Sequence, residues 1–185
     1  MENNRLQFEP ITEDEKLWAV FYEDDDRNIL QKTFEKWSNL DYLEEFFDRH
    51  LTDLSSYFHI TDVDEAIYDT IQDARTLECL ILDLKPETNL DELFRPLENL
   101  RPPERVLSKE KAKGKASLRH PSWLRLYAIR FEQGRYLITG GAIKLTRTME
   151  ERDHTLRELV KMEQVRSYLI ENGAIDFEGF MEMIQ

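Results

Sequence analysis

The stretch WLRLYAIRFEQGRYLITGGAIKLT, residues 123–146, carries the clearest structural signal in the chain. In its first half two sets of side chains alternate: Trp123, Arg125, Tyr127 and Ile129 with Leu124, Leu126, Ala128 and Arg130. This period of two is typical of a β-strand. The tripeptide Glu-Gln-Gly at 132–134 predicts a tight turn, and residues 135–146 predict one or two further strands. We therefore expect residues 123–131 and 135–146 to pair as antiparallel strands, with a bulge or a close backbone approach at Gly140-Gly141.

The residues before this hairpin favour one strand and two helices. Residues 16–22 are rich in aromatic and β-branched side chains and predict a strand. From Arg27 onward, apolar residues recur at spacings of three and four, which predicts an amphipathic helix broken near Ser38-Asn39. A second helix is expected to begin at Thr61 or Asp62, because both residue types are good N-caps.

The residues after the hairpin predict a third helix. Thr148 and Glu151 have the spacing of a capping box, so we expect the helix to open at Thr148. Gly173 fits its C-terminal end. Together these elements predict an α+β fold, in which a mostly helical N-terminal region packs with a small antiparallel sheet and a C-terminal helix.

The chain divides into three regions by composition. Residues 1–100 form an acidic, mostly helical region with an early strand, and residues 123–185 form the hairpin or sheet with its long helix. Between them, residues 101–122 are rich in Pro, Lys and Gly and predict a basic connector. The connector could be an arm that holds RNA or a solvated linker, and its composition slightly favours the linker for most of its length.

Charge follows the same division. Residues 1–100 hold 26 acidic and 9 basic residues, a net charge of −17, although the whole chain has a net charge of −13. Residues 101–149 hold 12 basic and 3 acidic residues, a net charge of +9. The basic stretch can attract phosphate, and the acidic half would repel it. The two surfaces could instead neutralise each other within one fold.

Several classes of protein are excluded by what the sequence lacks. It has no run of about 20 apolar residues and no signal-peptide pattern, so we expect a cytoplasmic protein that does not enter a membrane. Its single cysteine, Cys79, excludes an internal disulfide, and we expect it to pack rather than react. The sequence has no Gly-rich phosphate loop, HExxH, CxxC pair or nucleophile elbow, and its histidines are dispersed. We therefore predict no cofactor and no metal.

The remaining candidates for chemistry are bases and tyrosines on and around the hairpin. They are Arg119, Arg125, Arg130, Arg135, Lys144 and Arg147, with Tyr127 and Tyr136 among them. Such a set can hold an RNA backbone, stack on a base and stabilise the charge of a phosphoryl transition state. Alternation places Arg130 on the opposite strand face from Arg125, so the bases cannot all share one surface. The alternative is that they are polar-face residues of a half-exposed sheet, neutralised by the acidic helices.

The run LRLYAIRFEQGRYLITGGAIKLTRTMEERDHTLREL resembles the C-terminal half of toxins of the RelE/HigB family. In that pattern LYAIR at 126–130 takes the place of the first strand and GRYLI at 134–138 that of the second. The stretch GGAIKLTRTMEERDH at 140–154 takes the place of the last strand and the start of the helix. The similarity covers about 50 residues, and the first 100 residues have no counterpart in it.

The resemblance implies a function and a set of partners. It implies a toxin-like, RNA-binding protein, a ribosome-associated mRNA endoribonuclease of a bacterial toxin–antitoxin or defence locus, whose partners are RNA or the ribosome and an antitoxin of helix-turn-helix type. By the resemblance Arg130, Arg135 and Lys144 would be its catalytic residues, with Arg147 a weaker match. From the set of bases and tyrosines around the hairpin we expect Arg119, Arg125, Arg147, Tyr127 and Tyr136 to bind RNA. The rival hypothesis is a non-enzymatic interaction or scaffold protein, whose acidic helices bind a basic partner.

Overall fold

The computed structural model describes residues 6–22, 25–97, 107–114 and 119–185, and within them it confirms the predicted α+β class. The helices are α1 (Ile29–Trp37), α2 (Leu40–Arg49), α3 (Leu51–Phe58), α4 (Val63–Leu82), α5 (Leu90–Leu93), α6 (Asp153–Glu171) and α7 (Phe177–Ile184). The strands are β1 (Gln7–Pro10), β2 (Leu17–Phe21), β3 (Phe94–Pro96), β4 (Ser108–Lys113), β5 (Leu124–Glu132) and β6 (Arg135–Ile143).

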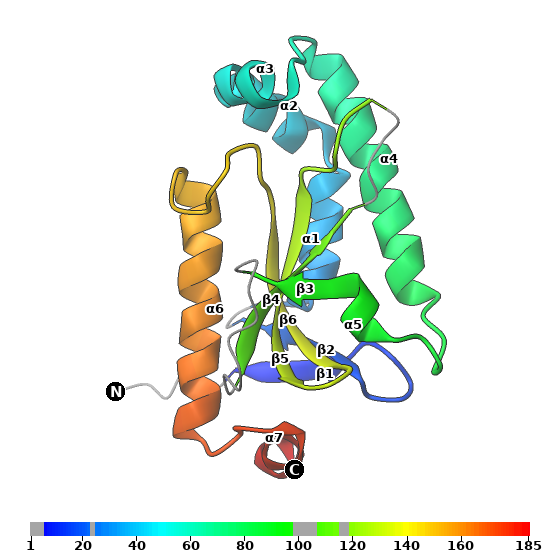
Figure 1. Cartoon of the computed structure of the whole chain (residues 1–185), viewed down its shortest axis with the longest axis vertical. Coiled ribbons are helices and arrows are strands. Elements are labelled where there is room, and N and C mark those ends of the chain that lie inside the picture. Colours follow the sequence, from blue (N-terminus) through cyan, green and yellow to red (C-terminus); the bar gives the residue numbers. More distant parts are fainter. Residues whose placement is uncertain (1–5, 23–24, 98–106, 115–118) are drawn as a thin grey trace.

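The strands form one six-stranded sheet in the order β1-β2-β6-β5-β4-β3 (Figure 1). The sheet is larger than the small antiparallel sheet expected from the sequence, and it is mixed, because β2 runs parallel to β6 while the other neighbours are antiparallel. All three regions predicted from composition supply strands to it. The acidic region and the basic hairpin therefore share one sheet.

The predicted hairpin is confirmed. Strands β5 and β6 pair antiparallel, with Leu124 opposite Ile143 and Glu132 opposite Arg135. The register shifts between Tyr127 and Ala128, which produces the bulge expected near the two glycines. A Cβ built on Gly140 would lie 1.9 Å from the Glu158 carboxylate, so this glycine allows α6 to approach the strand.

The predicted connector requires a correction, because Ser108–Lys113 is a strand rather than a linker. Strand β4 pairs with both β3 and β5, and it buries Glu110 and Ala112 completely. The Lys, Glu and Ala of this segment have low strand propensity, but pairing on both sides and burial of one face override that preference. The rest of the connector and its boundary near residue 100 lie largely outside the described residues.

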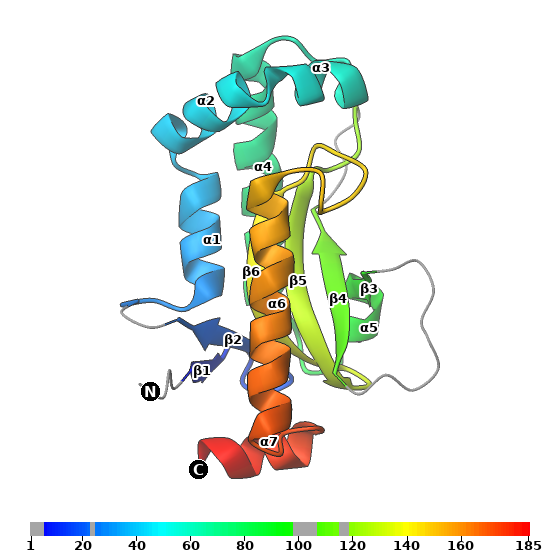
Figure 2. The same cartoon turned by 90° about the vertical axis from the view of Figure 1, so that its left-hand side faces the viewer.

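Helices cover both faces of the sheet (Figures 1 and 2). Helix α6 packs on β5 and β6 from one side, and α1 and α4 lie on the other. The main core includes Trp37, Phe47 and Trp123 on the α1 and α4 side, all of them almost fully buried, and it extends to Val165 and Leu169 of α6. A second, smaller cluster under α6 contains Tyr127, Ala142, Met149 and Met162.

The ends of most helices follow the sequence signals. Asn39 caps α2 after the predicted break, and the Asp62 side chain accepts hydrogen bonds from the backbone of Asp64 and Glu65 at the start of α4. Gly173, with a φ of 78°, follows the end of α6. Among the described residues no helix combines the length and the apolar character needed to cross a membrane.

Helix α6 begins later than predicted, at Asp153 instead of Thr148. The expected contact is present, because the Glu151 carboxylate accepts a hydrogen bond from the Thr148 backbone N–H. The backbone carbonyls of this segment nevertheless accept hydrogen bonds from side chains. Lys144 donates to the carbonyls of Thr146 and Arg147, and Thr155 donates to that of Met149. Residues 144–152 therefore form a loop held by side-chain hydrogen bonds instead of a first helical turn.

Residues of α3 and of the end of α2 contact this loop and the start of α6. The Arg152 guanidinium donates two hydrogen bonds to the buried Asp53 carboxylate, at 2.5 and 2.7 Å, and lowers the pKa of Asp53. The His50 and His154 rings lie 4.9 Å apart, and His154 Nε2 donates to the Ile143 carbonyl. These contacts fix the end of β6 and the loop that follows it.

Candidate functional site

Four basic side chains gather on the face of the sheet that α6 covers, near the end at which α6 begins. We call Lys111 and Lys113 of β4, Arg125 of β5 and Lys144 after β6 the basic cluster. Lys113 lies opposite Arg125, and Lys111 lies opposite Tyr127, which packs under α6. Because residues paired across strands share a face, the strand register brings these side chains together. The Lys144 backbone N–H donates to the Trp123 carbonyl, which places Lys144 at the same end.

The hydrogen bonds of the basic cluster go to backbone carbonyls. Lys111 Nζ donates to the Leu97 carbonyl at 2.8 Å, and Lys144 Nζ donates to those of Thr146 and Arg147 at 2.6 and 2.5 Å. Arg125 Nη1 donates to the carbonyls of Ser122 and Leu124 at 2.7 and 2.8 Å. These contacts orient the cations without neutralising them. Within the described part of the chain, none of the four forms an ion pair with a carboxylate.

Arg125 is the best-positioned member of the basic cluster. Its Nη1 is anchored by two carbonyls, while its Nε and Nη2 have no hydrogen-bond partner among the described residues. Nε and Nη2 form the edge of a guanidinium that binds two oxygens of a phosphate or carboxylate. A fixed guanidinium with a free edge is suited to bind an anion in one orientation.

The cations of the basic cluster repel one another. The positive charge of Arg125, followed by burial, lowers the pKa of Lys113. Burial comes first in lowering the pKa values of Lys111 and Lys144, and the neighbouring cations lower both further. Burial also lowers the pKa of Arg125. A bound anion would offset part of this repulsion.

Among the described residues, the lack of ion pairs in the basic cluster contrasts with three other bases around the hairpin, which have carboxylate partners. Arg119 pairs with Glu65 at 2.8 Å, Arg130 with Asp91 at 3.3 Å, and Arg135 with Glu132 at 2.9 Å. A chain with 38 acidic residues could neutralise the basic cluster in the same way. In the described structure Asp73, Glu110 and Glu151 act on the basic cluster electrostatically without pairing with it. A surplus of positive charge on one face is typical of an anion-binding surface.

The structure does not bring together the three residues predicted to be catalytic. Arg130 and Arg135 lie at the turn of the hairpin, and Lys144 lies beyond the other end of β6, about 30 Å away for nine residues of strand. Arg135 also lies over the Phe177 ring, 4.1 Å from its centroid. As the alternation predicts, the register puts Arg130, opposite Ser108, on the other face from Arg125. Only Lys144 of the three belongs to the basic cluster.

The prediction that Tyr127 and Tyr136 bind RNA is wrong, because both side chains are completely buried. Tyr127 packs against Met149 and Met162, and burial raises its pKa. Its hydroxyl has no hydrogen-bond partner in the described structure. Tyr136 stacks on Phe94 at 4.5 Å between ring centroids and donates to the Asp91 carboxylate. Neither ring can stack on an RNA base.

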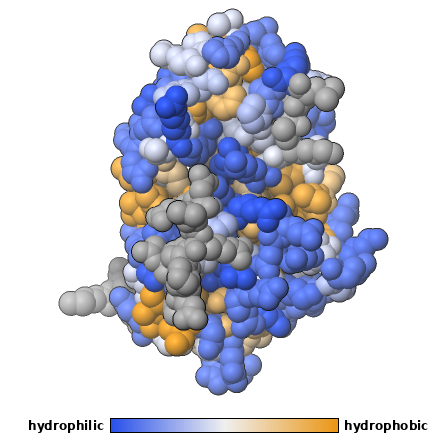
Figure 3. All heavy atoms as spheres, in the orientation of Figure 1, coloured by the Kyte–Doolittle hydropathy of each residue, from blue (hydrophilic) through white to orange (hydrophobic). Residues whose placement is uncertain are grey.

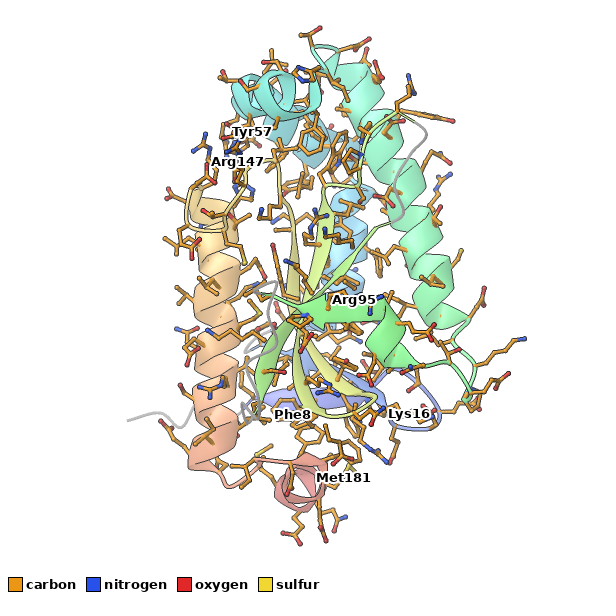
Figure 4. All side chains as sticks on the ribbon, in the orientation of Figure 1. Phe8, Lys16, Tyr57, Arg95, Arg147 and Met181 are labelled. Atoms are coloured by element: carbon orange, nitrogen blue, oxygen red, sulfur yellow. The ribbon has the colours of Figure 1, made fainter. Side chains whose placement is uncertain are left out.

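Of the other predicted RNA-binding residues, Arg125 is in the basic cluster, Arg119 is held by acidic residues of α4, and Arg147 is exposed. Figure 4 shows Arg147 with Tyr57 at the end of the molecule where α3 meets the loop before α6. Tyr57 is 41% exposed, and its hydroxyl lies 3.5 Å from the Glu151 carboxylate. An exposed ring there could stack on a base. Tyr57 was not among the residues expected to bind RNA, because the sequence did not predict α3 as a separate helix.

An apolar groove lies along the C-terminal half of α4 and reaches Lys113, the one member of the basic cluster that lines it. It has a volume of about 560 Å³ and is lined by Thr76, Leu77, Cys79, Leu80, Asp83, Leu84, Thr88 and Lys113. Figure 3 shows apolar side chains over the C-terminal half of α4, next to a mainly hydrophilic surface. Cys79, which was expected to pack rather than react, is exposed and lines this groove. The described residues contain no group of three or more His, Cys, Asp or Glu side chains that could hold a metal ion.

Comparison with protein-family models, with curated proteins and with solved structures finds no match to this chain.

Proposed function

We propose that this chain is a toxin-like, RNA-binding protein that acts as a ribosome-associated mRNA endoribonuclease of a bacterial toxin–antitoxin or defence locus. The observation that carries the proposal is the basic cluster: four cations from β4, β5 and the residue after β6, three of them oriented by backbone carbonyls and none paired with a carboxylate in the described structure. Such a surface binds a phosphate backbone.

The basic cluster supplies the groups that RNA cleavage requires. The free edge of Arg125 would bind two oxygens of the scissile phosphate and stabilise the charge that develops on them. Lys113 is exposed, and its pKa is lowered by Arg125, so a larger fraction of it is neutral than of an ordinary lysine. Its neutral amine would accept the proton of the ribose 2′-hydroxyl, while the 2′-oxygen attacks phosphorus and the 5′-oxygen leaves.

Lys144 would be the general acid. Its ammonium is fixed by two carbonyls of the loop after β6, which would place it to donate a proton to the leaving 5′-oxygen. Lys144 is also the one residue that both the resemblance to RelE/HigB toxins and the basic cluster select. One strand, β6, covers the two stretches that the resemblance assigns to separate strands.

The proposal is tested by growth and by RNA cleavage. Inducible expression of the wild-type chain should arrest growth of a bacterial host, and the purified protein should cleave mRNA, alone or on ribosomes. Lys113→Gln should lower the cleavage rate about 100-fold, because it removes the general base and one phosphate contact. Because Lys113 is exposed, the Lys113→Gln protein should keep the melting temperature of the wild type.

The matched control is Lys85→Gln, which removes the same charge from the exposed turn after α4, outside the basic cluster. It should cleave at the wild-type rate. If the wild type neither arrests growth nor contacts RNA or ribosomes, the endoribonuclease is excluded. A chain that is harmless and binds a basic protein partner would instead be an interaction or scaffold protein.

A further inference from the structure

Three aromatic rings meet where the end of α2 contacts the start of α6. The centroid of the His50 ring lies 4.5 Å from that of Phe46 and 4.9 Å from that of His154. The rings of Phe46 and His154 are 5.1 Å apart and nearly perpendicular. His50 is the C-cap of α2, and His154 lies in the first turn of α6. We call these three residues the histidine joint, and neither of its histidines takes part in the proposed cleavage.

The histidine joint is connected to the basic cluster through the backbone. His154 Nε2 lies 2.8 Å from the Ile143 carbonyl, which only accepts hydrogen bonds, so the neutral ring carries its proton on Nε2. Ile143 is the last residue of β6 and directly precedes Lys144, whose ammonium is held by carbonyls of the following loop. His154 therefore fixes the backbone from which Lys144 extends.

The surroundings of His154 disfavour a positive charge on its ring. Burial lowers the pKa of His154, and the hydrogen bond to the Ile143 carbonyl offsets only part of this effect. The charges of His50, of Lys36 in α1 and of Arg157 in α6 lower the pKa further. The first turn of a helix is also the positive end of its dipole. The folded chain therefore favours the neutral ring.

His50 is disfavoured as a cation for similar reasons. Burial is the first cause that lowers the pKa of His50, and Arg152 and Arg49 lower it further. The Asp53 carboxylate, 3.6 Å from His50 Nδ1, raises the pKa without cancelling the effect of burial. Asp53 already accepts two hydrogen bonds from the Arg152 guanidinium, which limits what it can offer to a charged His50.

The sign of the pH dependence follows from these two directions. Both histidines have a lower pKa in the folded chain than the ordinary value of about 6.5. Below about pH 6.5 the unfolded chain therefore binds more protons than the folded one. The stability that the two neutral rings contribute is complete above this pH and is lost as the pH falls below it. Glu158, one turn further along α6, is paired with Lys161 at 2.7 Å and is not a hydrogen-bond partner of His154 among the described residues.

We propose that His154 is a positioning residue for Lys144, and that protonation of the His50–His154 pair in acid releases the start of α6 with the loop at 144–152 and so slows RNA cleavage. The link to cleavage rests on the proposed function, in which Lys144 is the general acid. The contact between the histidine joint and the end of β6 exists without RNA and is tested without it.

Thermal melting of His154→Gln tests the histidine joint alone. The glutamine amide can still donate to the Ile143 carbonyl, but it does not take up a proton. Between about pH 7.5 and about pH 5.5 the melting temperature of the wild type should fall further than that of His154→Gln. The matched control is His59→Asn, which replaces an exposed histidine after α3 whose left-handed backbone Asn tolerates, and it should follow the wild type. Equal losses in the wild type and in His154→Gln overturn the histidine joint.

Single-turnover cleavage tests the link to Lys144. At about pH 7.5 His154→Leu, which has no donor for the Ile143 carbonyl, should cleave about tenfold more slowly than the wild type, and His154→Gln should restore most of the rate. At about pH 5.5 His154→Gln should cleave faster than the wild type, because its side chain stays neutral. A role in packing alone would give no advantage to His154→Gln in acid.

The outcomes separate this inference from the proposed function. If His154→Gln resists acid in melting but cleaves like the wild type at both pH values, the positioning of Lys144 is overturned and the proposed function stands. If the wild type cleaves no RNA, the proposed function fails and the positioning role fails with it, while the melting comparison still decides whether the histidine joint is sensitive to acid.

Discussion

Replacing Trp123 with alanine should lower the free energy of unfolding by about 3–5 kcal/mol, the cost of removing a large buried side chain from a close-packed core. Trp123 is 1% exposed and stacks on His120 with the ring centroids 4.1 Å apart. Its indole N–H donates to Thr70 of α4 at 2.9 Å. Trp123 therefore joins β5 to α4 at the end of the strand that carries Arg125. Urea denaturation followed by circular dichroism measures the loss.

Two further variants serve as controls for the loss of stability in Trp123→Ala. Trp123→Phe keeps an aromatic ring but leaves the Thr70 hydroxyl without its donor, and should cost about 1–3 kcal/mol. Tyr68→Ala removes a ring that is 62% exposed on the same helix, and should change stability by less than about 0.5 kcal/mol. A Trp123→Ala protein as stable as the Tyr68→Ala protein would contradict the packing of β5 against α4.

Replacing Arg125 with lysine should lower RNA cleavage about 100-fold while the chain stays folded. The charge is retained, but an ammonium cannot offer the planar edge formed by Nε and Nη2. The anchoring bonds from Nη1 to Ser122 and Leu124 are also lost or weakened, and this should cost about 1 kcal/mol of stability. Single-turnover cleavage and thermal melting, measured on the same preparations, separate the two effects.

Arg130→Lys is the matched control, because it makes the same change on the same strand. Arg130 contacts Asp91 at the turn of the hairpin, so its replacement should alter stability slightly and leave cleavage unchanged. Loss of cleavage in Arg130→Lys with full activity in Arg125→Lys would move the site to the turn of the hairpin. That outcome would contradict the assignment of the basic cluster.

The parts of the fold that the sequence predicted correctly are those controlled by local interactions. Alternation over 123–131 and the turn at Gly134 predicted β5 and β6, because strand period and turn geometry are local properties. Asn39 and Asp62 marked helix starts because capping bonds reach only a few residues. Strand β4 was missed because its pairing with β3 and β5 is a tertiary effect.

The site was predictable only in part, for the same reason. Arg125 and Lys144 were identified from the hairpin, but Lys111 and Lys113 were assigned to a linker, although their spacing of two is a strand pattern. Arg130 was predicted to be catalytic because its carboxylate partner, Asp91, lies 39 residues earlier in the chain and could not be recognised from the sequence. A sequence shows how many bases a segment holds, whereas the fold determines which of them remain without a carboxylate.

The salt dependence of RNA affinity tests the central claim most directly. If the four cations of the basic cluster bind phosphates, the logarithm of the association constant for single-stranded RNA should fall with the logarithm of salt concentration, with a slope of about −3. Lys113→Gln and Lys144→Gln should each make the slope less steep by about 0.7, while Lys85→Gln should leave it unchanged. An affinity that does not depend on salt, or a slope that is the same in all three variants, would show that the basic cluster does not bind RNA.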